Sequence, residues 1–180
     1  MEDLSLHILD IAENSIAANA DKIEIRIEED MKKDLLSIEV IDNGVGMDKE
    51  TLERATDPFY TSKTVRRFGF GLSLLSEAAK AANGHFSVQS KKGEGTIIKA
   101  DFQHSHIDRQ PLGDIGQTII TLVIGNPDID FVFEHKINNH TCSIDTRQIR
   151  TQLQSMPLNS LAGIKLLRQK LEKARKFPAQ

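Results

Sequence analysis

The chain of 180 residues carries a net charge of −3, and 39% of its residues are hydrophobic, a composition typical of a folded globular protein rather than a disordered one. The small negative charge gives no general attraction to nucleic acids or membranes, so we expect neither as a partner. The single cysteine, Cys142, excludes an internal disulfide, and no apolar run has the length of a signal-peptide core or a membrane span. We therefore expect a cytoplasmic protein.

The first hundred residues alternate between helical and strand patterns. Apolar residues at helical spacing predict an amphipathic helix over residues 4–20. Periodicity and turn residues predict, in chain order, strands 22–29 and 35–42, a helix 49–55 capped by Asp48, an irregular segment 56–71, a helix 72–83 stopped by Gly84, and strands 85–90 and 96–102. This order predicts an α+β fold, a two-layer sandwich with helices on one face of a mixed, mainly antiparallel sheet.

The remaining third of the chain has a different character. We expect a domain over residues 1–103, a linker at 104–117 and an accessory region at 118–180. The predicted elements of this region are a hairpin of strands 118–125 and 130–137, a short strand 141–144, a helix from Thr146 capped by Asp145, and a basic helix 160–176. Its strands either extend the sheet or form an appended unit. The basic helix is either a solvated face or a docking surface for an acidic partner.

The first helix places Asp3, His7, Asp10 and Asn14 on one polar stripe, away from its apolar face. Such a stripe is often only a solvated surface. Asp10 and Asn14, however, lie one helical turn apart and offer a carboxylate beside an amide, and oxygens of this kind suit Mg²⁺ or orient a water or hydroxyl.

Two glycine-containing segments stand at element boundaries. Asp42, Gly44 and Gly46 follow a strand without leading into a second one, so this is not a hairpin turn. Gly69 and Gly71 directly precede a helix, where backbone N–H groups and the helix dipole favour a phosphate. The alternative is a flexible loop entering a helix. Neither segment is a dinucleotide fingerprint or a P-loop.

Taken in order, "ENSIAANA", "DNGVGM", "FGFGLSL" and "GEGT" resemble the motifs of the GHKL superfamily, which contains gyrase, a heat-shock chaperone, histidine kinases and MutL. The resemblance covers residues 4–102 and implies a Bergerat-type ATP-binding fold. It implies that Asp42 accepts a hydrogen bond from the adenine amino group, that Asn14 holds Mg²⁺, and that Asp10 is the catalytic group. The other residues it assigns to ATP are Gly44, Gly46, Met47, Lys63, Gly69, Phe70, Gly71, Leu72 and Thr96. Lys63, Arg66 and Arg67 fall in the segment that matches the family's ATP lid, either reaching the γ-phosphate or lying in solvent.

The resemblance is closest to the catalytic domain of a sensor histidine kinase. Self-sufficient ATPases of the family usually carry glutamate where this chain has Asp10, so we expect slow hydrolysis. A standard histidine kinase places a helical hairpin with the phosphoacceptor histidine before this domain, whereas here the nucleotide-binding helix begins almost at Met1. We therefore expect Mg²⁺-dependent phosphoryl transfer from ATP to a separate protein, with His7 a minor alternative acceptor. Three alternative functions remain: a serine/threonine kinase of the anti-sigma-factor kind, a MutL-like slow ATPase, and a nucleotide-gated binding module. The sequence is also compatible with a homodimer.

Overall fold

The computed structural model describes residues 3–56 and 71–175. Within these residues the elements are α1 (Leu4–Ala17), β1 (Lys22–Asp30), β2 (Leu35–Asp42), α2 (Lys49–Thr56), α3 (Gly71–Ala81), β3 (His85–Lys91), β4 (Gly95–Gln103), α4 (Ile115–Gly125), β5 (Asp130–Ile137), β6 (His140–Asp145), α5 (Thr146–Leu153) and α6 (Leu161–Arg175).

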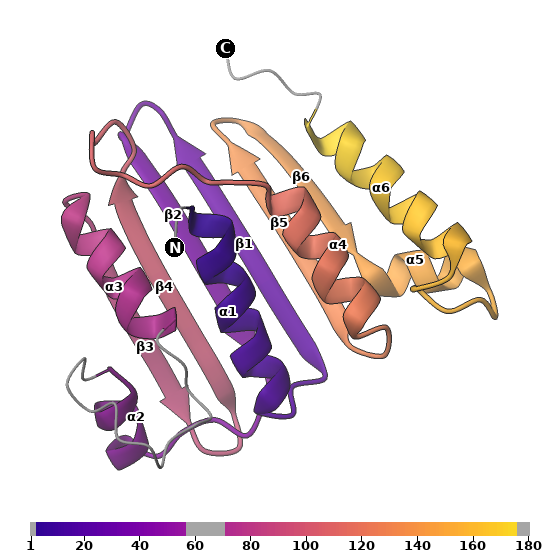
Figure 1. Cartoon of the computed structure of the whole chain (residues 1–180), viewed down its shortest axis with the longest axis horizontal. Helices are drawn as coiled ribbons and strands as arrows, with labels where there is room; N and C mark the ends of the chain where they lie inside the picture. The colour runs from indigo at the N-terminus through magenta and orange to yellow at the C-terminus, as the bar shows by residue number, and fades with distance from the viewer. Residues whose placement is uncertain (1–2, 57–70, 176–180) are drawn as a thin grey trace.

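The strands form one sheet in the order β3-β4-β2-β1-β5-β6, with α1, α3 and α4 over one face (Figure 1). All neighbouring strands are antiparallel except β1 and β5, which are parallel. On β1 the side chains of Ile23, Ile25 and Ile27 are buried, whereas Arg26 on the opposite face pairs with Glu39 at 3.1 Å. This alternation confirms the predicted α+β arrangement, in which helices cover one face of a mixed sheet.

Most predicted elements occur where the sequence placed them. The 22–29 and 35–42 strands form a hairpin in the register Ile25↔Val40, and β3 pairs with β4 around the "KKGEG" turn. Both predicted caps are present: Asp48 Oδ1 accepts from the Thr51 amide at 2.8 Å, and Asp145 Oδ1 accepts from the Arg147 amide at 2.9 Å.

The predicted strand at 118–125 is wrong, because residues Ile115–Gly125 form helix α4. Asp114 caps this helix by accepting from the Gln117 amide at 2.9 Å. The strands β4 and β5 run in the same direction, so a crossover helix rather than a tight turn must connect them. The helix packs against both α1 and α6, so apolar residues are buried around much of its circumference and helical periodicity is weak.

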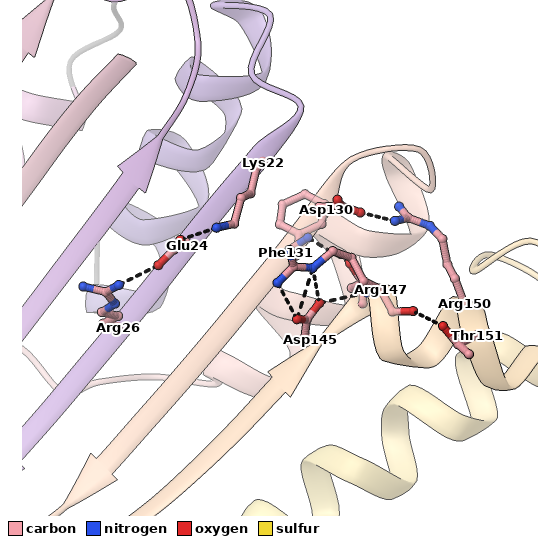
Figure 2. A network of polar contacts seen from close by, with 10 residues as sticks. Lys22, Glu24, Arg26, Asp130, Phe131, Asp145, Arg147, Arg150 and Thr151 are labelled. Atoms are coloured by element: carbon pink, nitrogen blue, oxygen red, sulfur yellow. Dashed lines mark hydrogen bonds and ion pairs between the residues drawn. The ribbon is translucent and has the colours of Figure 1, made fainter. Parts of the chain in front are cut away.

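The C-terminal strands extend the sheet instead of forming an appended unit, since β5 pairs with β1 along its whole length. Arg150 of α5 pairs with Asp130, the first residue of β5 (Figure 2). Its guanidinium also donates to the carbonyls of Pro127 and Ile129, each at 2.7 Å. The Arg147 guanidinium donates a hydrogen bond to Asp145 Oδ2 at 2.7 Å, as Figure 2 also shows. These contacts fix α5 to the sheet at its β5–β6 side.

At the C-terminal end of β1, the Glu29 carboxylate links β1 to β5 and to the segment that follows β4. Glu29 accepts from His135 Nε2 of β5 at 2.8 Å and from His104 Nε2, just after β4, at 3.0 Å. These hydrogen bonds, that of His135 above all, hold the pKa of the Glu29 carboxyl below its usual value. A lowered folded-state pKa means that the charged carboxylate stabilises the fold above the unfolded-state pKa, and that this contribution is lost as the pH falls through the folded-state pKa.

We predict that Glu29→Gln lowers the free energy of unfolding at pH 7 by about 1–3 kcal/mol, because the two imidazoles lose a shared charged acceptor. The difference from the unaltered protein should narrow below about pH 4.3, where the carboxyl protonates in the unfolded chain. Urea denaturation at pH 7 and pH 3.5 measures both quantities. Glu28→Gln is the matched control, since its pair with Lys136 is exposed. An equal loss in the two variants would contradict the prediction.

Candidate functional site

Asp42 ends β2 with its side chain buried and fixed from two directions. One carboxylate oxygen accepts from Ser15 Oγ of α1 at 2.7 Å, and the other accepts from the backbone amide of Gly44 at 2.9 Å. A carboxylate oxygen can accept more than one hydrogen bond, so Asp42 keeps capacity for a further donor. Sequence reasoning missed Ser15. The available signal was a hydroxyl four residues after Ile11 on the apolar face of α1, where it needs a partner.

Asp42 belongs to a row of polar side chains across three neighbouring strands. Thr96 of β4 lies directly opposite Asp42, and Ser90 of β3 lies directly opposite Thr96, so all three face the helix layer. The Ser90 and Thr96 hydroxyl oxygens are 2.9 Å apart, and Ser90 Oγ also accepts from the Met47 amide at 2.8 Å. The structure therefore brings together Asp42, Met47 and Thr96, three of the residues that the resemblance assigns to ATP, and adds Ser90, which sequence reasoning did not single out.

The glycine loop after β2 packs closely against its neighbours. The Val45 amide donates to the Ala18 carbonyl at 2.9 Å, and the Val45 carbonyl accepts from the Gly93 amide at 2.7 Å. A Cβ on Gly44 would lie 2.7 Å from the Ala18 carbonyl oxygen, and one on Gly46 would lie 2.0 Å from that of Lys91. Gly46 also has a φ of 62°. Both glycines are therefore required by the fold itself, before any ligand is considered.

A second group of polar atoms lies where α1 meets the start of α3. Asp10 and Asn14 are half-buried on α1, and neither side chain is tied by a hydrogen bond within the described ranges 3–56 and 71–175. Gly71 is the first residue of α3, and a Cβ there would lie 3.1 Å from Asp10 Oδ2. The next residue, Leu72, is buried. The first backbone N–H groups of a helix have no partner within it, so those of α3 are donors beside the Asp10 carboxylate.

Lys63, Gly69 and Phe70, together with Arg66 and Arg67, lie outside the described residues.

The prediction that His7 lies on a polar stripe away from the apolar face of α1 is wrong, because the His7 side chain is 1% exposed. The segment that follows β4 crosses the first turns of α1, where the Leu4 amide donates to the Pro111 carbonyl at 2.9 Å and His7 Nε2 lies 2.9 Å from Gln110 Oε1. Burial lowers the pKa of the His7 imidazole, which favours the neutral form. His7 is therefore not accessible as a phosphoacceptor in this structure.

In the described part of the chain, no cluster of three or more histidine, cysteine or acidic side chains has the geometry of a metal site. None of the helices in this part of the chain is long and apolar enough to cross a membrane.

Comparison with known proteins identifies the family. The model of the "histidine kinase-, DNA gyrase B-, and HSP90-like ATPase" family matches residues 2–106. The chain belongs to this family of ATPases.

Two curated relatives are a sensor histidine kinase and an anti-sigma factor. Sensor histidine kinase YxdK of Bacillus subtilis (strain 168) is 34% identical over 90 residues, which are 48% of this chain and 27% of that protein. The anti-sigma F factor of Clostridium beijerinckii (strain ATCC 51743 / NCIMB 8052) is 32% identical over 108 residues, which are 57% of this chain and 71% of that protein. The chain thus spans about a quarter of the sensor kinase's length.

A solved structure, the N-terminal domain of a DNA repair protein, matches 99% of this chain and 58% of its own, with a TM-score of 0.56 and 20% identity. Likeness at this identity shows the fold alone. The structural match nevertheless includes the C-terminal strands and helices, which lie beyond the residues matched by the family model.

We predict that Gly46→Ala lowers the free energy of unfolding by at least about 2 kcal/mol, since alanine must adopt a positive φ and displace the Lys91 carbonyl. Gly125→Ala is the control, because a Cβ there meets nothing within 4 Å. It should change stability by about 1 kcal/mol or less. Urea denaturation of both variants measures the difference, and similar values for the two would show that the loop is not packed as described.

Proposed function

We propose that the polar row at the strand ends binds ATP, with the adenine against Asp42 and Thr96 and the phosphates toward α3. The observation that carries this proposal is the Asp42 carboxylate, which is buried and held by Ser15 and Gly44 yet keeps acceptor capacity. An adenine amino group is a donor of the kind that such a carboxylate needs. Guanine presents an oxygen at the same position, and a buried acceptor without its donor costs about 1–3 kcal/mol.

The phosphate end of the proposed site lies between α1 and α3. Helix α3 begins at Gly71, where a Cβ would lie 3.1 Å from Asp10 Oδ2, so its N-terminus is close to α1. The first backbone N–H groups of a helix, here those of Gly71 and Leu72, are the donors that phosphate oxygens require. We assign Gly69, Phe70 and Lys63 to the same end on the family resemblance alone. Gly44, Gly46 and Met47 form the loop beneath the base.

The side-chain oxygen of Asn14 fits Mg²⁺, which typically takes one or two protein oxygens and completes its shell with water and phosphate. The amide is half-buried and has no hydrogen bond to another described residue, so its oxygen is available. When bound, Mg²⁺ would neutralise charge on the phosphate oxygens.

The reaction we propose is transfer of the γ-phosphoryl group to a separate protein. The bond between the γ-phosphorus and the bridging oxygen breaks, ADP keeps the electron pair, and an acceptor nitrogen or oxygen bonds to phosphorus. Asp10 takes the acceptor's proton, since its carboxylate is half-exposed beside the N-terminus of α3 and has no hydrogen bond to another described residue. Similarity to a sensor histidine kinase favours histidine as the acceptor.

A second candidate is transfer to serine or threonine, as in a kinase of the anti-sigma-factor kind. The alignment with an anti-sigma F factor spans 71% of that protein, a larger share than the 27% of the sensor kinase. Acid lability of the phosphorylated product separates the two, because phosphohistidine is lost in acid and phosphoserine is retained. Release of phosphate to water without any protein acceptor would favour a slow ATPase instead.

We predict that Asp42→Asn weakens ATP binding at least tenfold, because the amide nitrogen offers a donor where the adenine amino group needs an acceptor. Titration calorimetry with Mg²⁺-ATP measures the change. Asp48→Asn is the control: it keeps the cap of α2, as asparagine is also a good N-cap, and should leave affinity unchanged. Equal affinities of Asp42→Asn and the unaltered protein would make the adenine assignment wrong.

We predict that Asp10→Asn retains ATP binding within a fewfold but lowers turnover by about 10²–10⁴, the usual contribution of a positioned general base. Phosphate release from Mg²⁺-ATP and radiolabel transfer from γ-labelled ATP to co-purified proteins give the turnover. Glu13→Gln, an exposed acidic residue on the same helix, is the control. Unchanged turnover in Asp10→Asn would remove Asp10 from the mechanism.

A further inference from the structure

The hydroxyl of Ser90 lies at the centre of three polar contacts. Its oxygen is 2.8 Å from the Met47 amide nitrogen, 2.9 Å from Thr96 Oγ1 and 3.0 Å from the Gly95 carbonyl oxygen. Met47 ends the glycine loop and Thr96 lies opposite Asp42, so one side chain of β3 touches both walls of the proposed adenine site.

Only one assignment of donors and acceptors satisfies all three contacts of the Ser90 hydroxyl. The Met47 amide can only donate, so it takes one lone pair of Ser90. The Gly95 carbonyl can only accept, so it receives the one hydrogen of Ser90. The second lone pair of Ser90 then remains for Thr96, whose hydroxyl must donate to it. Thr96 Oγ1 is left with lone pairs only, and any further contact that it makes is as an acceptor.

We propose that Ser90 sets the specificity of the site by holding the Thr96 hydroxyl as an acceptor beside the Asp42 carboxylate. This inference rests on the proposed function of the site. Asp42 and Thr96, both buried and directly opposite each other, then present acceptors to position 6 of the purine, directly or through a water. An amino group at that position finds acceptors, whereas an oxo group meets oxygen lone pairs. Without Ser90 the Thr96 hydroxyl is free to turn and donate to an oxo group.

The test compares ATP with inosine triphosphate, which carries an oxo group in place of the adenine amino group. We measure the dissociation constants of both nucleotides by calorimetry for the unaltered protein and for Ser90→Ala, Ser90→Thr, Thr96→Val and the Ser90→Ala/Thr96→Val double variant. The deciding quantity is the dissociation constant of inosine triphosphate divided by that of ATP. Loss of the Met47 contact weakens the binding of both nucleotides alike and therefore leaves this ratio unchanged.

We expect Ser90→Ala to lower this ratio at least fivefold and Ser90→Thr, which keeps a hydroxyl, to retain it. In the Thr96→Val background, Ser90→Ala should leave the ratio unchanged, because no hydroxyl remains to turn. An unaltered ratio in Ser90→Ala, or an equal fall in the Thr96→Val background, overturns the role of Ser90 while leaving ATP binding intact. Absence of ATP binding by the unaltered protein, or equal affinity for the two nucleotides, overturns the proposed adenine site itself and the inference with it.

Discussion

A buried carboxylate at the end of a strand must be held by hydrogen-bond donors, and the rest of this structure is arranged around that requirement at Asp42. One donor is Ser15 of α1, and the other is the Gly44 amide of the loop that follows the strand. The first contact requires α1 to lie close over the end of β2, and the second requires the loop to fold back at once. Glycine is needed for that return because the loop passes against Ala18 and Lys91.

The placement of α1 depends in turn on the C-terminal part of the chain. Helix α4 packs against α1, and the segment that leads into α4 covers the first turns of α1 and buries His7. Strand β5 extends the sheet beside β1, and the Asp130 amide donates to the Asp21 carbonyl at 2.8 Å, just before β1 begins. The family model ends at residue 106, yet the likeness to a DNA repair protein's N-terminal domain covers 99% of the chain. The C-terminal elements are therefore part of one fold with the family domain.

Local sequence patterns predicted much of this structure. The alternating apolar residues of β1 and β2 are local signals, and so are the side chains able to cap helices, such as Asp48 and Asp145. The strands and the helix starts could therefore be predicted directly from the sequence. Helix α4 could not be predicted in this way, because an apolar run of its length is compatible with a strand or with a helix buried on several sides. His7 was misplaced because the segment that covers it is about a hundred residues away in the chain. Ser15 and Ser90 were missed for the same reason: their partners are set by the packing of α1 and by the register of three strands.

The most direct test of the account is a map of backbone amide chemical shifts by NMR, recorded with and without Mg²⁺-ATP. We expect the largest changes at Gly44, Met47, Thr96 and Gly71, which line the two ends of the proposed site. We expect none at the opposite end of the sheet, around Asp34 and Gln103, which line a separate hollow of about 480 Å³. Changes concentrated at that far end, or none at saturating nucleotide, would contradict the claim that Asp42 marks an adenine-binding site.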